Sequence, residues 1–171
     1  MLIFFIIFLV ILIGRSNSYL LGFELLNIDE SQMMANAIRL QLNNYNIFQF
    51  DGTSSGFLNS LILTWPNLLN LDVTFLSTRI TAIILISVIF YIAYLYLRLD
   101  LKKTSSILLV LPGVLVFSFT NDPDFLHYSS ELLSTSLIIF ALYSYKKYFH
   151  TNKIRIHLIG MSLLSLVIFA K

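Results

Sequence analysis

Long apolar runs alternate with short polar stretches along this chain, and this pattern predicts its architecture. The clearest run covers residues 80–97, which suits a membrane-spanning helix and ends in tyrosines typical of a membrane interface. Four further apolar runs predict helices at residues 2–14, 105–119, 125–145 and 154–170. In the third predicted span, Pro112 and Gly113 indicate a kink or a break. We therefore expect an all-α, polytopic transmembrane bundle of about five spans.

The first apolar run, residues 1–13, has two interpretations. It is short for a bilayer, which needs roughly 20 apolar residues, and its length also suits the core of a signal peptide. No basic residue precedes it, however, and no small-residue cleavage site follows it. We favour a first transmembrane helix whose true beginning lies upstream, with a signal peptide as the alternative. Because the sequence stops at Lys171, directly after an apolar run, we expect an N-terminal fragment of a longer protein.

Residues 15–78 form a long loop that contains two amphipathic segments. In the first, apolar residues recur at helical spacing from Met33 to Leu42, and in the second they recur from Phe57 to Leu69. A cluster of turn-forming residues at 51–56 separates the two segments. We expect two helices that lie in the membrane interface, and simple packing on the bundle is a compatible alternative.

Composition and charge strengthen the membrane assignment and predict an orientation. Hydrophobic residues make up 57% of the chain and charged residues 12%, which lies outside ordinary globular usage. The absence of cysteine excludes disulfides and thiol chemistry. Most basic residues occupy two short loops, which the positive-inside rule places in the cytoplasm. These residues are Arg98, Lys102, Lys103, Lys146, Lys147, Lys153 and Arg155. The opposite face then carries every acidic residue except Asp100.

Two adjacent acids, Asp29 and Glu30, open the first amphipathic segment. In so apolar a chain, a pair of acids just outside a predicted membrane span is a candidate for chemistry. Asp29 is equally suited to cap the helix, because Gln32 follows three residues later as a near match to a capping box. The residues alone leave both roles open.

A second polar cluster leads into the fourth predicted span. If Pro123 begins that helix, Asp124, His127 and Glu131 share one of its faces. A glutamate about two turns inside a span is costly unless it is paired or lines a wet cavity, so Glu131 indicates a functional site. The alternative is a structural pair between Glu131 and either His127 or Arg79.

The order of these parts resembles the GT-C fold membrane glycosyltransferases. The closest group is the protein O-mannosyltransferase and aminoarabinose-transferase-like set, and the resemblance covers essentially the whole chain. Its motifs are Asp29-Glu30, Asp51-Gly52-Thr53-Ser54-Ser55-Gly56-Phe57-Leu58-Asn59 and Ser77-Thr78-Arg79. Phe57 stands where the family has a proline, and Phe169-Ala170-Lys171 is similar to the start of a segment that continues in the family. The resemblance implies that residues 1–171 are the N-terminal part of a GT-C catalytic domain.

The resemblance also implies a reaction. A hexosyl or pentosyl group would pass from a polyprenyl-phosphate donor to a hydroxyl of a lipid, glycan or protein. The transfer would take place on the extracytoplasmic face of a bacterial inner membrane. Asp29 matches the acid that acts as general base in the family, with Glu30 beside it. Arg39 or Arg79 would then neutralise the departing lipid phosphate.

A divalent cation is a further implication of the resemblance. Asp124, His127 and Glu131 match the second-loop residues that hold such an ion in some members of the family. Members differ in their use of a metal, so Mg²⁺ or Mn²⁺ remains an open alternative to the two arginines.

Two other functions are alternatives to a glycosyltransferase. A transporter or lipid flippase subunit would use an intramembrane Glu/His proton relay, but it would not need two interfacial helices between its first spans. A non-catalytic membrane scaffold ranks third. A Gly-rich phosphate loop and a nucleophile elbow are both absent from the sequence, so nucleotide-sugar and hydrolase mechanisms have no support. Membrane lipids are the expected surroundings, and no nucleic acid is expected as a partner.

Overall fold

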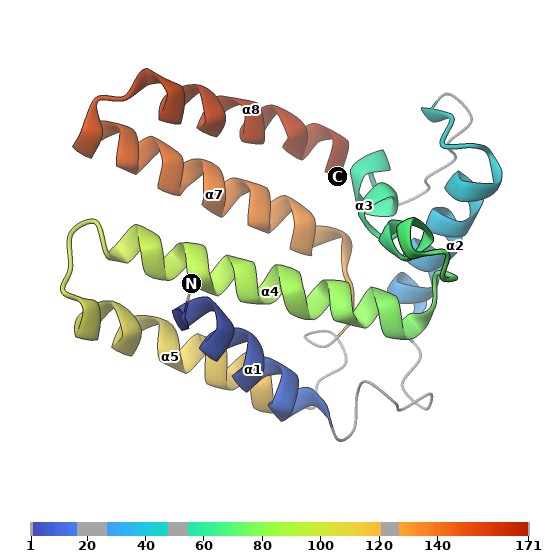
Figure 1. Cartoon of the computed structure of the whole chain (residues 1–171), viewed down its shortest axis with the longest axis horizontal. Coiled ribbons are helices and arrows are strands. Elements are labelled where there is room, and N and C mark those ends of the chain that lie inside the picture. Colours follow the sequence, from blue (N-terminus) through green and yellow to red (C-terminus); the bar gives the residue numbers. More distant parts are fainter. Residues whose placement is uncertain (1, 17–26, 48–54, 121–126, 171) are drawn as a thin grey trace.

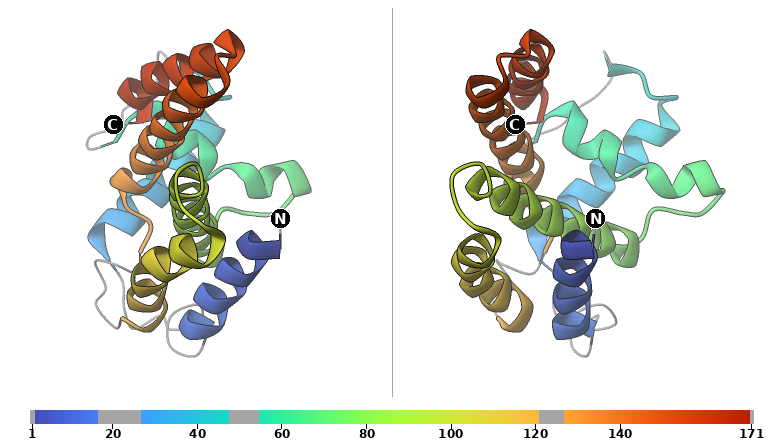
Figure 2. Two further views of the ribbon diagram at one scale, coloured as in Figure 1. Left: turned by 90° about the vertical axis from the view of Figure 1, so that its left-hand side faces the viewer. Right: turned by 60° about the vertical axis from the view of Figure 1, so that its left-hand side comes forward.

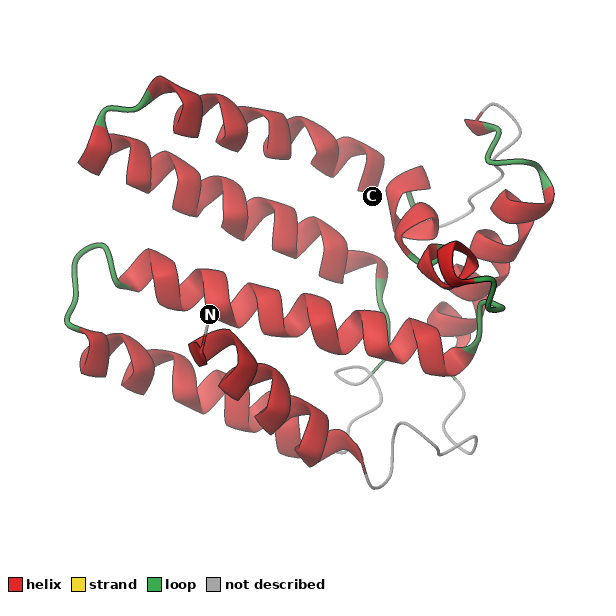
Figure 3. Ribbon diagram, in the orientation of Figure 1, coloured by secondary structure: helices red, strands yellow, loops and turns green. Residues whose placement is uncertain are grey.

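The computed structural model describes residues 2–16, 27–47, 55–120 and 127–170, and the structural statements below concern these ranges. Within them the chain forms seven α-helices and one 3₁₀ helix, and no strand (Figure 3). They are α1 (Leu2–Ser16), α2 (Ile28–Leu42), α3 (Phe57–Ile62), η2 (Trp65–Leu69), α4 (Phe75–Leu97), α5 (Lys103–Phe119), α7 (Ser130–Thr151) and α8 (Ile154–Ala170). The predicted all-α class is therefore confirmed for the described residues.

The helix α4 lies at the centre of the arrangement. It contacts α7 on one side and α1 and α5 on the other, and α8 packs on the outer side of α7 (Figure 1). The helices α2 and α3 gather at the end of the bundle where α4 begins, and the end of α8 comes close to α3 (Figures 1 and 2). Two apolar clusters share α4: one joins it to α2, α3 and α7, and the other joins it to α1 and α5.

A capping box sets the start of α4. The Thr74 hydroxyl accepts a hydrogen bond from the Ser77 N–H, and the Ser77 hydroxyl accepts one from the Thr74 N–H. The helix therefore begins at Phe75, five residues earlier than expected and inside the predicted loop 15–78. Of the helices in the described ranges, only α4 is long and apolar enough to cross a membrane. The helices α1, α5 and α8 are apolar but shorter.

Two prolines have different effects on the predicted helices. The second amphipathic segment is not one helix, because the ring of Pro66 would clash with the carbonyl four residues before it. The α-helix accordingly ends at Ile62, and Pro66 lies in the first turn of the separate helix η2. In contrast, α5 is one helix with Pro112 inside it, so of the predicted kink or break the break is wrong, and the kink stays a prediction.

The fourth predicted span is displaced along the chain. The helix α7 begins at Ser130, with Ser129 as its N-cap residue, and continues to Thr151. His127 precedes the helix, and Glu131 is exposed in its first turn rather than two turns inside. The prediction of a helix face shared by Asp124, His127 and Glu131 is therefore wrong. Asp124 itself and residues 51–54 of the predicted turn lie outside the described residues.

Candidate functional site

A buried carboxylate lies where α2 packs against the first turn of α4. The Glu30 side chain is 0% exposed, and its Oε2 atom lies 3.3 Å from Nε of Arg79, whose side chain is 2% exposed. The same oxygen lies 3.7 Å from Nε2 of the buried His127. The Thr78 hydroxyl donates a hydrogen bond of 3.3 Å to Oε1. Three segments far apart in sequence therefore meet at Glu30, and we call these four residues the Glu30 cluster.

The start of α2 explains how Glu30 reaches this position. Asn27 is the N-cap residue, and its side-chain oxygen accepts a hydrogen bond of 2.7 Å from the Asp29 N–H. Asp29 therefore does not cap the helix, and the predicted capping box with Gln32 is wrong. Capping at Asn27 places Glu30 in the first helical turn, where the helix dipole favours a negative charge.

Opposing effects act on the Glu30 carboxyl. Burial raises the pKa of Glu30 above its ordinary value of 4.5, because a charged group loses hydration in the interior. The positive charge of Arg79, the nearby imidazole of His127, and the hydrogen bonds from Arg79 and Thr78 act in the opposite direction and lower the pKa of Glu30. A buried ion pair of this kind is weak evidence for a large gain in stability. Its clearer consequence is geometric, because it joins α2 to the start of α4.

Asp29 has the opposite environment. It is exposed, and no ion pair is found for its carboxylate among the described residues. Successive residues of an α-helix point about 100° apart, so Asp29 faces away from the buried direction of Glu30. Of the two adjacent acids, only Asp29 is therefore exposed at the surface.

The remaining predicted site residues do not join the Glu30 cluster. Arg39 is exposed in the last turn of α2, nine residues beyond Glu30 and about 13 Å further along the helix axis. The acid that pairs with Arg79 and His127 is Glu30, so the predicted structural pair of Glu131 with either residue is wrong. The described residues contain no group of three His, Asp or Glu side chains that could hold a metal ion.

A second buried network lies beside the Glu30 cluster and was missed at the level of sequence. The Tyr128 hydroxyl donates a hydrogen bond of 2.7 Å to Oδ1 of Asn59. The amide nitrogen of Asn59 donates to the carbonyl of Ser130, at 2.9 Å, and to the carbonyl of Ala170. Burial raises the pKa of Tyr128, which keeps its hydroxyl protonated and able to donate.

This second network fixes the segment that carries His127. Asn59 in α3 holds both the start of α7 and the end of α8, and Tyr128 directly follows His127 in the chain. Two weak signals in the sequence could have indicated this network. Asn59 ends the motif that begins at Asp51, and Tyr128 follows His127. We call Asn59, Tyr128 and the two carbonyls the Asn59 network.

Comparisons of the chain with protein-family models, with curated proteins and with solved structures find no match. The resemblance to GT-C glycosyltransferases therefore rests on the short motifs and on the order of the parts. Two of these motifs, Asp29-Glu30 and Ser77-Thr78-Arg79, meet in the Glu30 cluster.

Proposed function

We propose that this protein is a membrane glycosyltransferase. It moves a sugar from a polyprenyl-phosphate donor to a hydroxyl acceptor, at the end of the bundle where α2 lies. The observation that supports this proposal is the contrast between two neighbouring acids. Glu30 is buried and held by Arg79, Thr78 and His127, whereas Asp29 is exposed on the same helix. This arrangement fixes α2 and leaves one carboxylate accessible to a substrate.

In the proposed orientation α1, α4, α5, α7 and α8 cross the membrane. The α4–α5 and α7–α8 connections, where the basic residues cluster, lie at one end of the bundle, and α2 and α3 lie at the other (Figure 1). The positive-inside rule then places the candidate site on the extracytoplasmic face. The three shorter apolar helices are accommodated by local thinning of the bilayer, at a modest free-energy cost.

Asp29 is the general base in the proposed reaction. The acceptor oxygen attacks the anomeric carbon, the bond from that carbon to the phosphate oxygen breaks, and the acceptor proton passes to Asp29. Negative charge grows on the departing polyprenyl phosphate. Arg39, exposed on the same helix as Asp29, is available to stabilise that charge, whereas Arg79 is buried against Glu30.

A transporter or flippase subunit with a Glu/His relay is the second candidate function. That hypothesis depended on a glutamate deep within a span, and Glu131 is exposed in the first turn of α7. No metal-dependent step is part of the proposal: His127 contacts Glu30, and Asp124 lies outside the described residues.

A donor assay on the full-length protein tests the proposal. Membranes that contain the protein are given a radiolabelled sugar on a synthetic polyprenyl phosphate, or the same sugar on a nucleoside diphosphate. The proposal predicts transfer to endogenous acceptors from the lipid-linked donor alone, in proportion to the amount of protein. Transfer from the nucleotide sugar alone, or no transfer from a panel of hexosyl and pentosyl lipid donors, would contradict it.

A further inference from the structure

The helices α1 and α5 run parallel and approach most closely near their C-terminal ends. An added Cβ at Gly14 would lie 2.5 Å from the Ser118 carbonyl oxygen, so a larger residue does not fit there. One residue further, Nε of the buried Arg15 donates a hydrogen bond of 2.8 Å to the Phe117 carbonyl. These two contacts fix α1 against α5 at this end of the pair.

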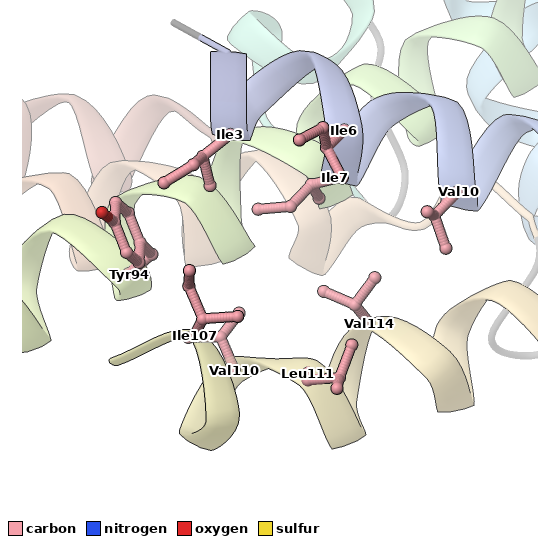
Figure 4. Close-up of a pocket in the computed structure, with 9 residues that line it drawn as sticks. All are labelled: Ile3, Ile6, Ile7, Val10, Tyr94, Ile107, Val110, Leu111 and Val114. Atoms are coloured by element: carbon pink, nitrogen blue, oxygen red, sulfur yellow. The ribbon is translucent and has the colours of Figure 1, made fainter. Parts of the chain in front are cut away.

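Towards the N-terminal ends of the same two helices, a pocket of about 190 Å³ separates them (Figure 4). Aliphatic side chains of α1 and α5, among them Ile7, Val110 and Val114, line it together with the ring of Tyr94 from α4. Its surface is entirely apolar. The pocket is open on one side, and its apolar lining offers water no hydrogen-bond partner, whereas an apolar group that enters it gains dispersion contacts with both helices. An apolar group is therefore the favoured occupant.

The pocket adjoins a positive charge. Lys103 is exposed in the first turn of α5. It precedes the lining residues Ile107, Val110 and Val114 by four, seven and eleven positions, which is the spacing of one helix face. Arg98 and Lys102 occupy the connection immediately before α5. An occupant with an apolar chain and an anionic head is therefore complementary to both the lining and the charge at the pocket's end.

We infer that this pocket binds one hydrocarbon chain of an anionic phospholipid, with the phosphate of the headgroup at Lys103. The inference rests on the membrane insertion proposed above, but not on the transfer of a sugar. The cytoplasmic leaflet, where the basic connections are placed, has anionic lipids whose negative surface potential attracts Lys and Arg near the membrane. The lipid is held at the end of the bundle opposite to Asp29, so it is distinct from the donor and the acceptor.

Native mass spectrometry on the detergent-solubilised full-length protein tests the inference. The probes are phosphatidylglycerol and phosphatidylcholine with identical acyl chains. We expect one phosphatidylglycerol to be retained per chain, and phosphatidylcholine to be lost at the same activation energy. Ile107→Trp fills the pocket and should abolish retention. Leu108→Trp changes the next residue, which does not line the pocket and is 61% exposed, and it should leave retention unchanged.

A second variant changes the charge beside the pocket at an exposed position, so its effect on lipid retention does not depend on a change in the apolar packing. Lys103→Gln is an exposed change and should weaken retention of phosphatidylglycerol roughly fivefold, which corresponds to the attraction of one lysine near an anionic surface. Lys153→Gln, an exposed change in the α7–α8 connection, should leave it unchanged. Equal retention of both lipids, no retained lipid, or equal effects of Ile107→Trp and Leu108→Trp would overturn the inference. A disulfide-linked dimer of Ile6→Cys would overturn it in favour of a second copy as the occupant.

The donor assay separates this inference from the proposed function. A protein that transfers sugar but retains no phosphatidylglycerol would overturn the lipid site alone. A protein that retains the lipid but transfers nothing from any donor would overturn the proposed enzyme alone.

Discussion

Arg79 and Glu30, 49 residues apart in the chain, form an ion pair of 3.3 Å in which both side chains are almost completely buried. The pair joins the helix that follows the first apolar run to the start of the central helix α4. His127, from the segment before α7, lies on the same carboxylate oxygen as Arg79. The ion pair therefore acts together with the apolar cluster that includes Met33 and Ala37 to hold α2 against α4, with Asp29 exposed.

Removing the arginine should destabilise the protein strongly. Arg79→Gln leaves the Glu30 carboxylate buried with His127 and Thr78 as its remaining partners in the cluster. Breaking a buried ion pair in this way costs about 3–5 kcal/mol in the free energy of unfolding. We expect the double variant Glu30→Gln/Arg79→Gln to recover most of that loss, as measured by thermal unfolding in detergent at neutral pH. Losses that simply add in the double variant would show that the two residues are not coupled.

The pKa of Glu30 predicts a pH dependence. Because burial raises the folded-state pKa above 4.5, the folded protein binds the Glu30 proton more tightly than the unfolded chain does. The stability that this group contributes is fully present below pH 4.5 and is lost as the pH rises through the folded-state pKa. Glu30→Gln is neutral at every pH and should remove this decline from a series of thermal unfolding curves. The exposed change Asp72→Asn should keep it, and an unchanged decline in Glu30→Gln would contradict the prediction.

The local pattern of the chain was sufficient to predict most of the helices but not the contacts between them. Apolar runs and helical periodicity predicted the bounds of α1, α2, α4, α5 and α8 to within about five residues, because those signals are local. The predicted start of α7 was wrong. Asp122 and Pro123 have the residue types of a helix start, but α7 begins at Ser130. Asn27 was overlooked as the N-cap because the adjacent acids offered a competing signal.

The buried partner of Arg79 was beyond the reach of local reasoning for a different reason. From the sequence alone, either Asp29 or Glu30 could be the buried acid. The rotation of α2 about its axis decides that Glu30 faces α4 and that Asp29 faces outwards. Likewise, the contact between Glu30 and His127 joins residues nearly a hundred positions apart. No periodicity within one segment carries information about such a contact.

Removing the Tyr128 hydroxyl from the Asn59 network should lower the stability of the protein. Tyr128→Phe removes the donor to Asn59 Oδ1 and leaves that buried oxygen without its closest partner. An unsatisfied buried acceptor costs about 1–3 kcal/mol, so the free energy of unfolding should fall by that amount. Tyr145→Phe is the matched control, because Tyr145 is half exposed and should change the stability by less than about 0.5 kcal/mol. Equal effects of the two variants would show that the Tyr128 hydroxyl contributes no specific bond.

The proposed orientation predicts which positions are accessible from outside the cell. Residues 1–171 contain no cysteine, so a cysteine introduced among them is the single thiol of this part of the protein. Asp72→Cys, in the exposed connection before α4, should react with a membrane-impermeant maleimide in intact cells. Thr104→Cys, at the start of α5 and also exposed, should react only after lysis. The reverse pattern would place the candidate site in the cytoplasm and remove the argument for an extracytoplasmic transferase.

The central claim is that Asp29 is a general base rather than a structural residue, and one substitution separates these roles. Asn27 supplies the cap, so Asp29→Asn leaves the start of α2 intact, yet an amide cannot accept a proton at neutral pH. We predict that the full-length Asp29→Asn variant loses transfer of sugar from the lipid-linked donor by about 10²–10⁴-fold, with an unchanged thermal unfolding curve. The matched exposed change Asp72→Asn should retain wild-type transfer. Transfer by Asp29→Asn at the wild-type rate, with equal amounts of protein in the membrane, would contradict the mechanism.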